Sequence, residues 1–409
     1  MTDELEVLRF VRRADVYKAG ALAATLTRER AAIVFCYEDS YLQSGGPPVA
    51  TTLPFSPEPV RTHAPGALPP FFSGLLPEGR RLSALRRAVK TSADDELSIL
   101  LAVGSDSVGD VKVVPEGDTP AETEPRVVAA SWGDVRFATL YAEAAGNEPL
   151  DRYAIPGVQD KVSARMISLP VDRAGDRFIL KLDPPEFPHL VENEAFFMRA
   201  AHLSGLPVAK AEVVHDSEGR AGLLVERFDR VPSGDGSVRS VAQEDGCQVL
   251  GLYPADKYRL TVEEVVGGLV SVTRARPVAA LELLRQVAFA FLTCNGDAHA
   301  KNFSVVRPEA EWRVSPAYDL PSSYPYGDHT MALTIAGRSR EDIDRDAFVA
   351  LGEHVGLPRR ATEKALDALV DRCGTWLGDL DELPFDSRRV HKLRRAAEYR
   401  RARLGRKHG

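Results

Sequence analysis

The chain has 409 residues, which is enough for two or three domains and a sizeable core. Hydrophobic residues make up 44% of it and charged residues 27%, the balance of an ordinary globular protein. A net charge of -7 gives no general case for binding nucleic acid or a membrane, and no apolar run reaches the roughly 18 residues of a membrane span.

The cysteines and the first residues indicate a cytoplasmic protein. The four cysteines lie far apart with no CxxC pair, which is typical of reduced thiols and not of a zinc site or a disulfide framework. The opening Met-Thr-Asp-Glu-Leu-Glu is acidic and lacks the basic start and apolar core of a signal peptide. We therefore expect a cytoplasmic location and no membrane contact.

Residues 1–125 are predicted to form a small β-rich N-terminal subdomain. Short apolar alternations at 6–11 and 31–36, divided by turn signals, indicate a small antiparallel sheet. Two helices follow, the second beginning at Asp94 as its N-cap. The acidic, proline-containing stretch 116–125 has the composition of a linker, so we place a domain boundary there.

Residues 126–236 have the order of elements of a protein-kinase small lobe. A strand over 177–182 carries Lys181 in its interior, and the helix over 192–203 carries Glu194 near its start. Further strands lead into a connector. Lys181 and Glu194 are therefore predicted to form the ion pair that sets a lysine against the ATP phosphates. Each alone has a plainer explanation, because strand lysines usually reach solvent and a carboxylate suits the start of a helix.

Residues 237–409 are dominated by helical patterns and are predicted to form an all-α catalytic lobe. The long apolar helix over 278–294 breaks at Asn295-Gly296 into a polar loop. Asp297 is followed five residues later by Asn302, which is the spacing of the kinase catalytic loop, where the Asp receives a hydroxyl proton and the Asn holds magnesium. On spacing alone, a helix C-cap followed by a solvated turn is the simpler explanation.

Asp319 supplies the second acid that a kinase site needs. It comes seventeen residues after Asn302 and follows a strand-like run, although Leu-Pro replaces the Phe-Gly that usually follows this acid. Asn302, Asp319 and phosphate oxygens would make a normal magnesium environment, since this metal keeps few protein ligands. Because these residues occur in kinase order, phosphoryl transfer with ATP and Mg²⁺ is favoured.

The other candidate site residues are weaker. Between two predicted strands, Gly157, Gln159 and Lys161 lie where a phosphate-covering loop belongs, but with one glycine a plain hairpin turn is the alternative. Lys301 is predicted to neutralise the transferring phosphate. His299 is a candidate ligand contact, with a structural hydrogen bond in the loop as the plainer role.

The C-terminal stretch 388–409 holds ten Lys or Arg residues and one acid, Glu398. Its pattern predicts a helix with Val390, Leu393 and Ala397 on one face. A solvated basic face is the usual explanation, and contact with nucleic-acid phosphates is the alternative.

Two motifs are specific enough to indicate a family, Gln-Glu-Asp-x-Cys-Gln at 243–248 and Gly-Asp-x-His-x-Lys-Asn at 296–302. Supporting stretches lie at 71–79, 103–109, 157–161, 225–230 and 318–319. Over nearly its full length the chain resembles the HipA-type serine/threonine kinases, the toxins of HipA/HipB-like bacterial toxin–antitoxin systems. The expected fold is thus α+β, a protein-kinase-like two-lobed fold with an extra N-terminal β-rich subdomain.

The resemblance also implies residue roles and partners. The roles are a catalytic base at Asp297, magnesium ligands at Asn302 and Asp319, an ATP phosphate contact at Lys181, and adenine contacts at Glu226 and Phe228. Family members phosphorylate proteins, notably aminoacyl-tRNA synthetases, and so arrest translation. They pair with a small helix-turn-helix antitoxin, HipB-like, that represses their shared operon. DNA contact is expected only indirectly, through that complex.

One departure from the family leaves alternatives open. The family commonly autophosphorylates a serine just before the Gly157 loop, where this chain has Ala154. Ser163 and Tyr153 are the alternative acceptors, and Pro156 removes one backbone N–H from the loop. We expect restraint mainly by the partner. The other hypotheses are a catalytically weak kinase fold acting as a binding and co-repressor module, and a small-molecule phosphotransferase.

Overall fold

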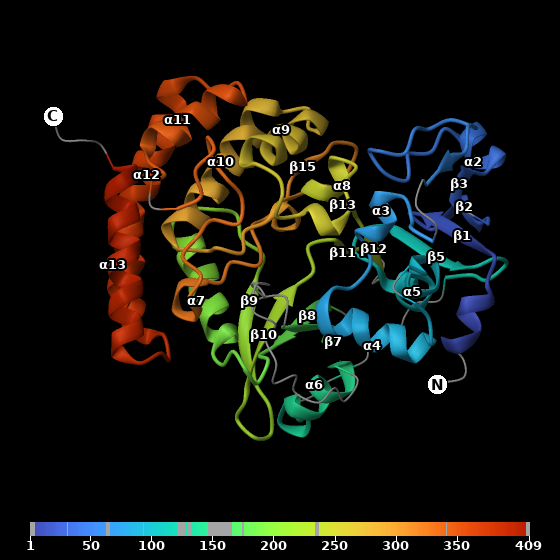
Figure 1. Ribbon diagram of the computed structural model, residues 1–409, viewed down its shortest axis with the longest axis horizontal. Coiled ribbons are helices and arrows are strands. Elements are labelled where there is room, and N and C mark those ends of the chain that lie inside the picture. Colours follow the sequence, from blue (N-terminus) through green and yellow to red (C-terminus); the bar gives the residue numbers. More distant parts are fainter. Residues whose placement is uncertain are drawn as a thin grey trace.

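The computed structural model describes residues 5–30, 32–62, 66–92, 94–120, 127–128, 132–145, 166–173, 176–233, 237–340 and 342–405. In Figure 1 the N-terminal elements lie at the right, a central sheet lies below the middle, and the C-terminal helices lie at the top and left. Several residues of the predicted phosphate loop and its surroundings lie outside the described part of the chain: Tyr153, Ala154, Pro156, Gly157, Gln159, Lys161 and Ser163.

The N-terminal part is built on an antiparallel sheet, as predicted. Its strands run in the order β4-β3-β2-β1-β5. They are β1 (Arg13–Lys18), β2 (Ala21–Arg28), β3 (Ile33–Tyr37), β4 (Val60–Arg61) and β5 (Val111–Pro115). The prediction of a strand at 6–11 is wrong: this stretch contains the 3-10 helix η1 (Val7–Phe10), and since none of its side chains is buried, the sheet gains nothing by pairing it.

Short helices cover this sheet: α2 (Asp39–Ser44), α3 (Pro70–Ser73), α4 (Gly79–Val89), α5 (Glu96–Val103) and η2 (Gly104–Asp106). The N-cap of α5 is Asp95, one residue later than predicted, and its side chain accepts the Ser98 N–H. Phe35 of β3 and Phe72 of α3 are fully buried with ring centroids 5.7 Å apart, so the sheet and α3 share one core. Burying a side chain of this size is worth about 1.5–3 kcal/mol.

The central sheet has the order β6-β7-β8-β10-β9. Its elements are β6 (Val127–Val128), η3 (Trp132–Asp134), α6 (Phe137–Ala145), β7 (Ile167–Arg173), β8 (Asp176–Leu182), α7 (Leu190–Leu203), β9 (Ala211–His215) and β10 (Ala221–Glu226). Leu180 and Leu182 pack with α6 on one face. Side chains alternate along a strand, so Lys181 points to the other face, beside Leu223, where α7 lies.

The C-terminal lobe is α-rich. Its helices are α8 (Gly246–Val249), η5 (Pro254–Asp256), α9 (Val262–Val272), α10 (Arg276–Leu292), η6 (Ala300–Asn302), η7 (Tyr324–Tyr326), α11 (Arg345–His354), α12 (Arg359–Leu377), η8 (Gly378–Glu382) and α13 (Ser387–Leu404). It is not all-α, because β13 (Ala242–Asp245), β14 (Ser304–Arg307) and β15 (Arg313–Val314) form a small sheet, and β11 (Arg230–Pro232) pairs with β12 (Val238–Ser240) before it. These strands of two to four residues are too short to show a period of two in the sequence.

Among the described residues, the buried hydrophobic side chains form three clusters, in the N-terminal part, between α6 and the central sheet, and in the C-terminal lobe. The last cluster includes α7, whose Phe197 ring lies 5.8 Å from that of Trp376 in α12. Val390, Leu393 and Ala397, which were predicted to share one face of a helix, lie in α13 and are buried in this cluster. No helix in the described ranges is long and apolar enough to cross a membrane.

Candidate active site

Asp319 joins three elements at the boundary between the central sheet and the C-terminal lobe. Lys181 of β8 places its Nζ 2.8 Å from Asp319 Oδ1 and 2.6 Å from Oε1 of Glu194 on α7. Asn302 Nδ2 donates to Asp319 Oδ2 at 2.6 Å. Residues separated by up to 138 positions in the chain therefore meet in one polar cluster.

The loop that carries Asp297 is buried. Asp297, His299 and Asn302 are only 3%, 7% and 6% exposed. The helix α10 does end just before Asn295, but the simple alternative of a solvated turn after it is wrong. Buried polar groups of this kind need partners or a ligand.

Gly296 is required by the packing of this loop. A Cβ atom there would lie 2.6 Å from Ser323 Oγ and 2.7 Å from the Thr330 carbonyl oxygen, closer than real Cβ contacts come. The Gly296 N–H donates to Ser323 Oγ at 2.8 Å, and the Asp297 N–H donates to Asn295 Oδ1 at 3.0 Å. These contacts attach the loop to the chain that follows Asp319, and they hold the backbone of Asp297 in place.

Tyr258 is the partner of Asp297 that the sequence did not indicate. Its hydroxyl donates to Asp297 Oδ1 at 2.6 Å, and its ring meets the His299 ring edge-on at 5.0 Å. Burial and then the Asp297 charge raise the pKa of Tyr258 well above its ordinary value, so the phenol stays a donor. A lone tyrosine 39 residues before Asp297 carries no motif that marks it.

The pKa values of the three ionisable groups in the Lys181 cluster are shifted in different directions. Burial alone would lower the pKa of Lys181, but the carboxylates of Asp319 and Glu194 outweigh it and raise that pKa. Burial would likewise raise the pKa of Asp319, but the Lys181 ammonium outweighs burial and holds it below its ordinary value. For Glu194 burial wins and raises the pKa to about 7. Asp319 is therefore the more acidic of the two carboxyl groups that contact Lys181.

The chain around Asp319 is strained and held in place. Asp319 has φ of +57°, in the left-handed region that costs non-glycine residues energy and often marks functional sites. Two positions further on the sequence replaces the usual kinase glycine with Pro321. Asn193 of α7 then fixes Ser322, donating to its carbonyl at 2.8 Å and accepting its N–H at 3.0 Å.

Lys301 points toward the N-terminal part. Its Nζ lies 2.7 Å from Asp245 Oδ2, donates to the Gly74 carbonyl at 3.0 Å and lies 3.9 Å from Glu78. Glu78 also pairs with Lys257. The predicted contact of Lys301 with phosphate stays a prediction, but its observed contacts join the loop of Asp297 to the N-terminal part. Asp245 and Glu78 lie inside motif stretches noted in the sequence, without any sign of this role.

The remaining candidates lie near the cluster with different surroundings. Burial and then Lys257 lower the pKa of His299 to about 3, so this imidazole is neutral near pH 7. The Phe228 ring packs on the Tyr318 ring at 5.6 Å, so two aromatic rings lie next to Asp319. Glu226 instead pairs with Lys210 at the surface, and its predicted adenine contact stays a prediction.

The residues present fit a magnesium ion held by Asn302 and Asp319. Asn302 Oδ1 is buried and has no hydrogen-bond partner among the described residues, as expected of an oxygen that awaits a cation. In the same part of the chain, no three His, Cys, Asp or Glu side chains cluster into a ready metal site. A metal here would take its other ligands from phosphate and water, which is the usual habit of magnesium.

Comparison with known proteins identifies the family to which these features belong. Residues 14–114 match the family model of the HipA N-terminal domain, and residues 153–377 match that of the HipA-like C-terminal domain. The Sinorhizobium fredii protein named "Putative kinase Y4mE" is 32% identical over 406 residues, which cover 93% of this chain and 96% of that protein.

A second relative and a solved structure agree with these matches. The serine/threonine-protein kinase toxin HipA of Shewanella oneidensis is 30% identical over 344 residues, covering 78% of this chain and 77% of that protein. The solved Shewanella oneidensis complex of HipA, HipB and operator DNA contains a chain of the same fold, with a TM-score of 0.78, 23% identity and 96% of each chain covered.

Proposed function

The chain belongs to the HipA family, and on that premise we propose that it is an ATP- and Mg²⁺-dependent serine/threonine protein kinase. The observation that carries the proposal is the largely buried cluster of Lys181, Glu194, Asn302 and Asp319, which includes part of the loop of Asp297. An arrangement with a buried, partner-less amide oxygen and a strained acid is hard to explain as structure alone.

Each residue has a role in transfer. Asp297 accepts the proton of the attacking substrate hydroxyl, while the Tyr258 hydroxyl holds its carboxylate in one orientation. Lys181, oriented by Glu194, contacts the ATP phosphates, and Asn302 and Asp319 hold the metal. Bound Mg²⁺ supplies positive charge that stabilises the phosphates in the transition state. Phe228 and Tyr318 form an apolar surface suited to the adenine ring.

The biological setting that we propose is that of a toxin. The relative named a kinase toxin and the structural neighbour solved with HipB and operator DNA support a HipB-like helix-turn-helix antitoxin as partner. The substrate would be a protein of translation such as an aminoacyl-tRNA synthetase, and DNA contact would come through the antitoxin in the cytoplasm. We propose domain limits at 1–125, 126–236 and 237–409.

The experiment uses labelled ATP, Mg²⁺ and a bacterial lysate with purified wild type or Asp297→Asn protein. We expect a protein band labelled only by the wild type. Equal labelling by both proteins would contradict the base assignment. ATP binding without any labelled product would favour the binding and co-repressor module, and label in a metabolite fraction alone would favour the small-molecule phosphotransferase.

A further inference from the structure

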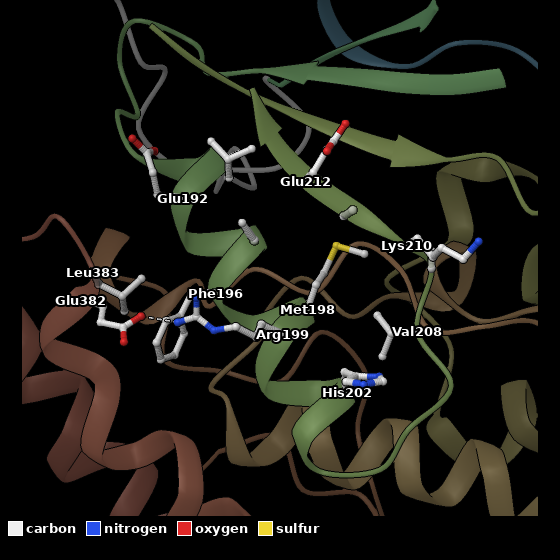
Figure 2. Close-up of a pocket in the computed structure, with 14 residues that line it drawn as sticks. Glu192, Phe196, Met198, Arg199, His202, Val208, Lys210, Glu212, Glu382 and Leu383 are labelled. Atoms are coloured by element: carbon white, nitrogen blue, oxygen red, sulfur yellow. Dashed lines mark hydrogen bonds and ion pairs between the residues drawn. The ribbon is translucent and has the colours of Figure 1, made fainter. Parts of the chain in front are cut away.

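A groove of about 560 Å³ lies on the outer side of α7, away from the Lys181 cluster. In Figure 2 it is bounded by α7, by the segment leading into β9, and by Glu382 and Leu383. Ala195 and Phe196 of α7 and Leu383 supply its apolar surface. Every residue that lines it belongs to the described part of the chain.

One side of the groove is a strand edge that pairs with no other strand of the described chain. β9 is the last strand of the central sheet. The Lys210 carbonyl accepts the Glu226 N–H at 2.8 Å and the Asp216 N–H donates to the Arg220 carbonyl at 3.0 Å, which fixes the register of hydrogen bonds toward β10. In antiparallel pairing these groups alternate, so the backbone N–H and C=O of Ala211 and Val213 point outward. Such an edge is a template for an added strand.

The charges at the groove favour a basic ligand. Its cations are already neutralised, since Arg199 pairs with Glu382 and Lys210 lies 3.0 Å from Glu226. Glu192 lies at the other end of the groove from His202 in Figure 2. Its Oε1 lies 3.6 Å from His189 Nδ1, and its Oε2 has no hydrogen-bond partner among the described residues. A Lys or Arg side chain would satisfy that oxygen.

We propose that this groove is a docking site for an extended segment of a partner protein, which adds to the sheet along β9. The segment places a basic side chain at Glu192 and, two residues away on the same face, an apolar side chain over Ala195 and Leu383. The period of two follows from strand geometry, and the backbone of β9 supplies the hydrogen bonds. This docking is independent of phosphoryl transfer.

The groove and the candidate active site share the helix α7. Glu192 and Ala195 line it, while Asn193 and Glu194, on the opposite side of the same turn of α7, hold Ser322 and Lys181. A docked segment therefore contacts the helix on which the candidate active site depends, without touching that site.

The test is a selection of phage-displayed random eight-residue peptides on the full-length protein, followed by fluorescence anisotropy with the enriched peptides. We expect enriched peptides to share a Lys or Arg and an apolar residue two positions away. Ala195→Trp, which fills the groove, should weaken their binding about tenfold or more, and Glu192→Gln by a smaller factor. Ala350→Trp, at an exposed position of α11, is the matched control and should leave binding unchanged.

Peptides methylated on alternate backbone nitrogens test strand addition, because methylation removes the donors that pair with β9. We expect one of the two methylated registers to lose binding. Equal binding by the wild type and Ala195→Trp, enrichment of acidic peptides, no enrichment at all, or full binding by both methylated registers would each overturn the proposal. None of these results depends on kinase activity, so failure here and failure of the proposed function are distinguishable.

Discussion

Two largely buried ionic networks differ in how completely their polar atoms are paired. At the junction between the N-terminal part and the connector after β10, Arg227 and Arg230 share Asp229 and Asp106 at 2.7–3.0 Å. The Gly109 N–H also donates to Asp229 at 2.9 Å. By contrast, the cluster around Lys181 leaves Glu194 Oε2 and Asn302 Oδ1 without hydrogen-bond partners among the described residues.

We interpret this difference as one between charged groups that stabilise the fold and charged groups that bind a ligand. Both networks are largely buried, and a buried charge is expensive unless it is paired. The junction meets this demand fully within the protein, with the Arg227 and Arg230 side chains only 5% and 7% exposed. The Lys181 cluster meets it only in part, which is the expected state of a site that gains its last partners from a ligand. Substitutions should therefore separate the two networks by their effects on activity and stability.

The largest expected effect is on activity, from Asp319→Asn. Loss of this anion removes a metal ligand and the main partner of Lys181, so we expect the transfer rate to fall about 10²–10³-fold. Lys181 keeps its contact with Glu194, so the midpoint of urea unfolding should change little. Steady-state phosphorylation rates and urea titrations of both proteins provide the measurement. A large loss of stability with normal activity would reverse the assignment of this cluster.

The next effect is on stability, from Asp229→Asn at the junction. Two buried arginines lose their shared carboxylate, which should lower the free energy of unfolding by about 3–5 kcal/mol. Activity per folded molecule should stay at the wild-type level, because Asp229 does not contact the Lys181 cluster. Asp381→Asn is the control: its pair with Arg394 is largely exposed and should be worth under about 1 kcal/mol. Equal effects of the two substitutions would remove the distinction between a buried and an exposed pair.

The smallest effect is a dependence of stability on pH that arises from Glu194. Its pKa in the folded protein is raised from 4.5 to about 7, so between these values the folded state holds a proton that the unfolded state has lost. The contribution of this group therefore falls as pH rises through that window. Relative to Glu194→Gln, the wild type should lose stability from pH 5 to pH 7 in urea titrations. Parallel curves, or a wild type that gains stability, would contradict the raised pKa.

Much of the candidate active site was predictable because its residues lie at fixed spacings within short motifs. Asp297 and Asn302 share one loop, and Lys181 and Glu194 lie on consecutive elements. Because these residues occur in the order found in kinases, the sequence predicted that they form one site. The start of the helix α9 at Val262 also has a local signal, because Thr261 and Glu264 form a capping box.

The rest depended on contacts between distant segments, which no local pattern records. Tyr258 reaches Asp297, and Lys301 reaches Gly74 across 227 positions, only because the fold brings these segments together. The packing of α7 into the C-terminal lobe has the same origin, since apolar spacing shows which face is buried but not which partner buries it. These tertiary contacts explain why the site spans all three parts of the molecule.

The most direct test of the central claim is the Mg²⁺ dependence of ATP binding, measured by calorimetry on wild type and Asn302→Leu. The claim is that the Lys181 cluster, in which Glu194 Oε2 and Asn302 Oδ1 lack partners among the described residues, binds a nucleotide and a metal. We expect Mg²⁺ to tighten ATP binding to the wild type, and the tightening to be lost in Asn302→Leu because the unpaired Oδ1 is gone. Absence of ATP binding by the wild type in Mg²⁺, or equal Mg²⁺ dependence in both proteins, would contradict it.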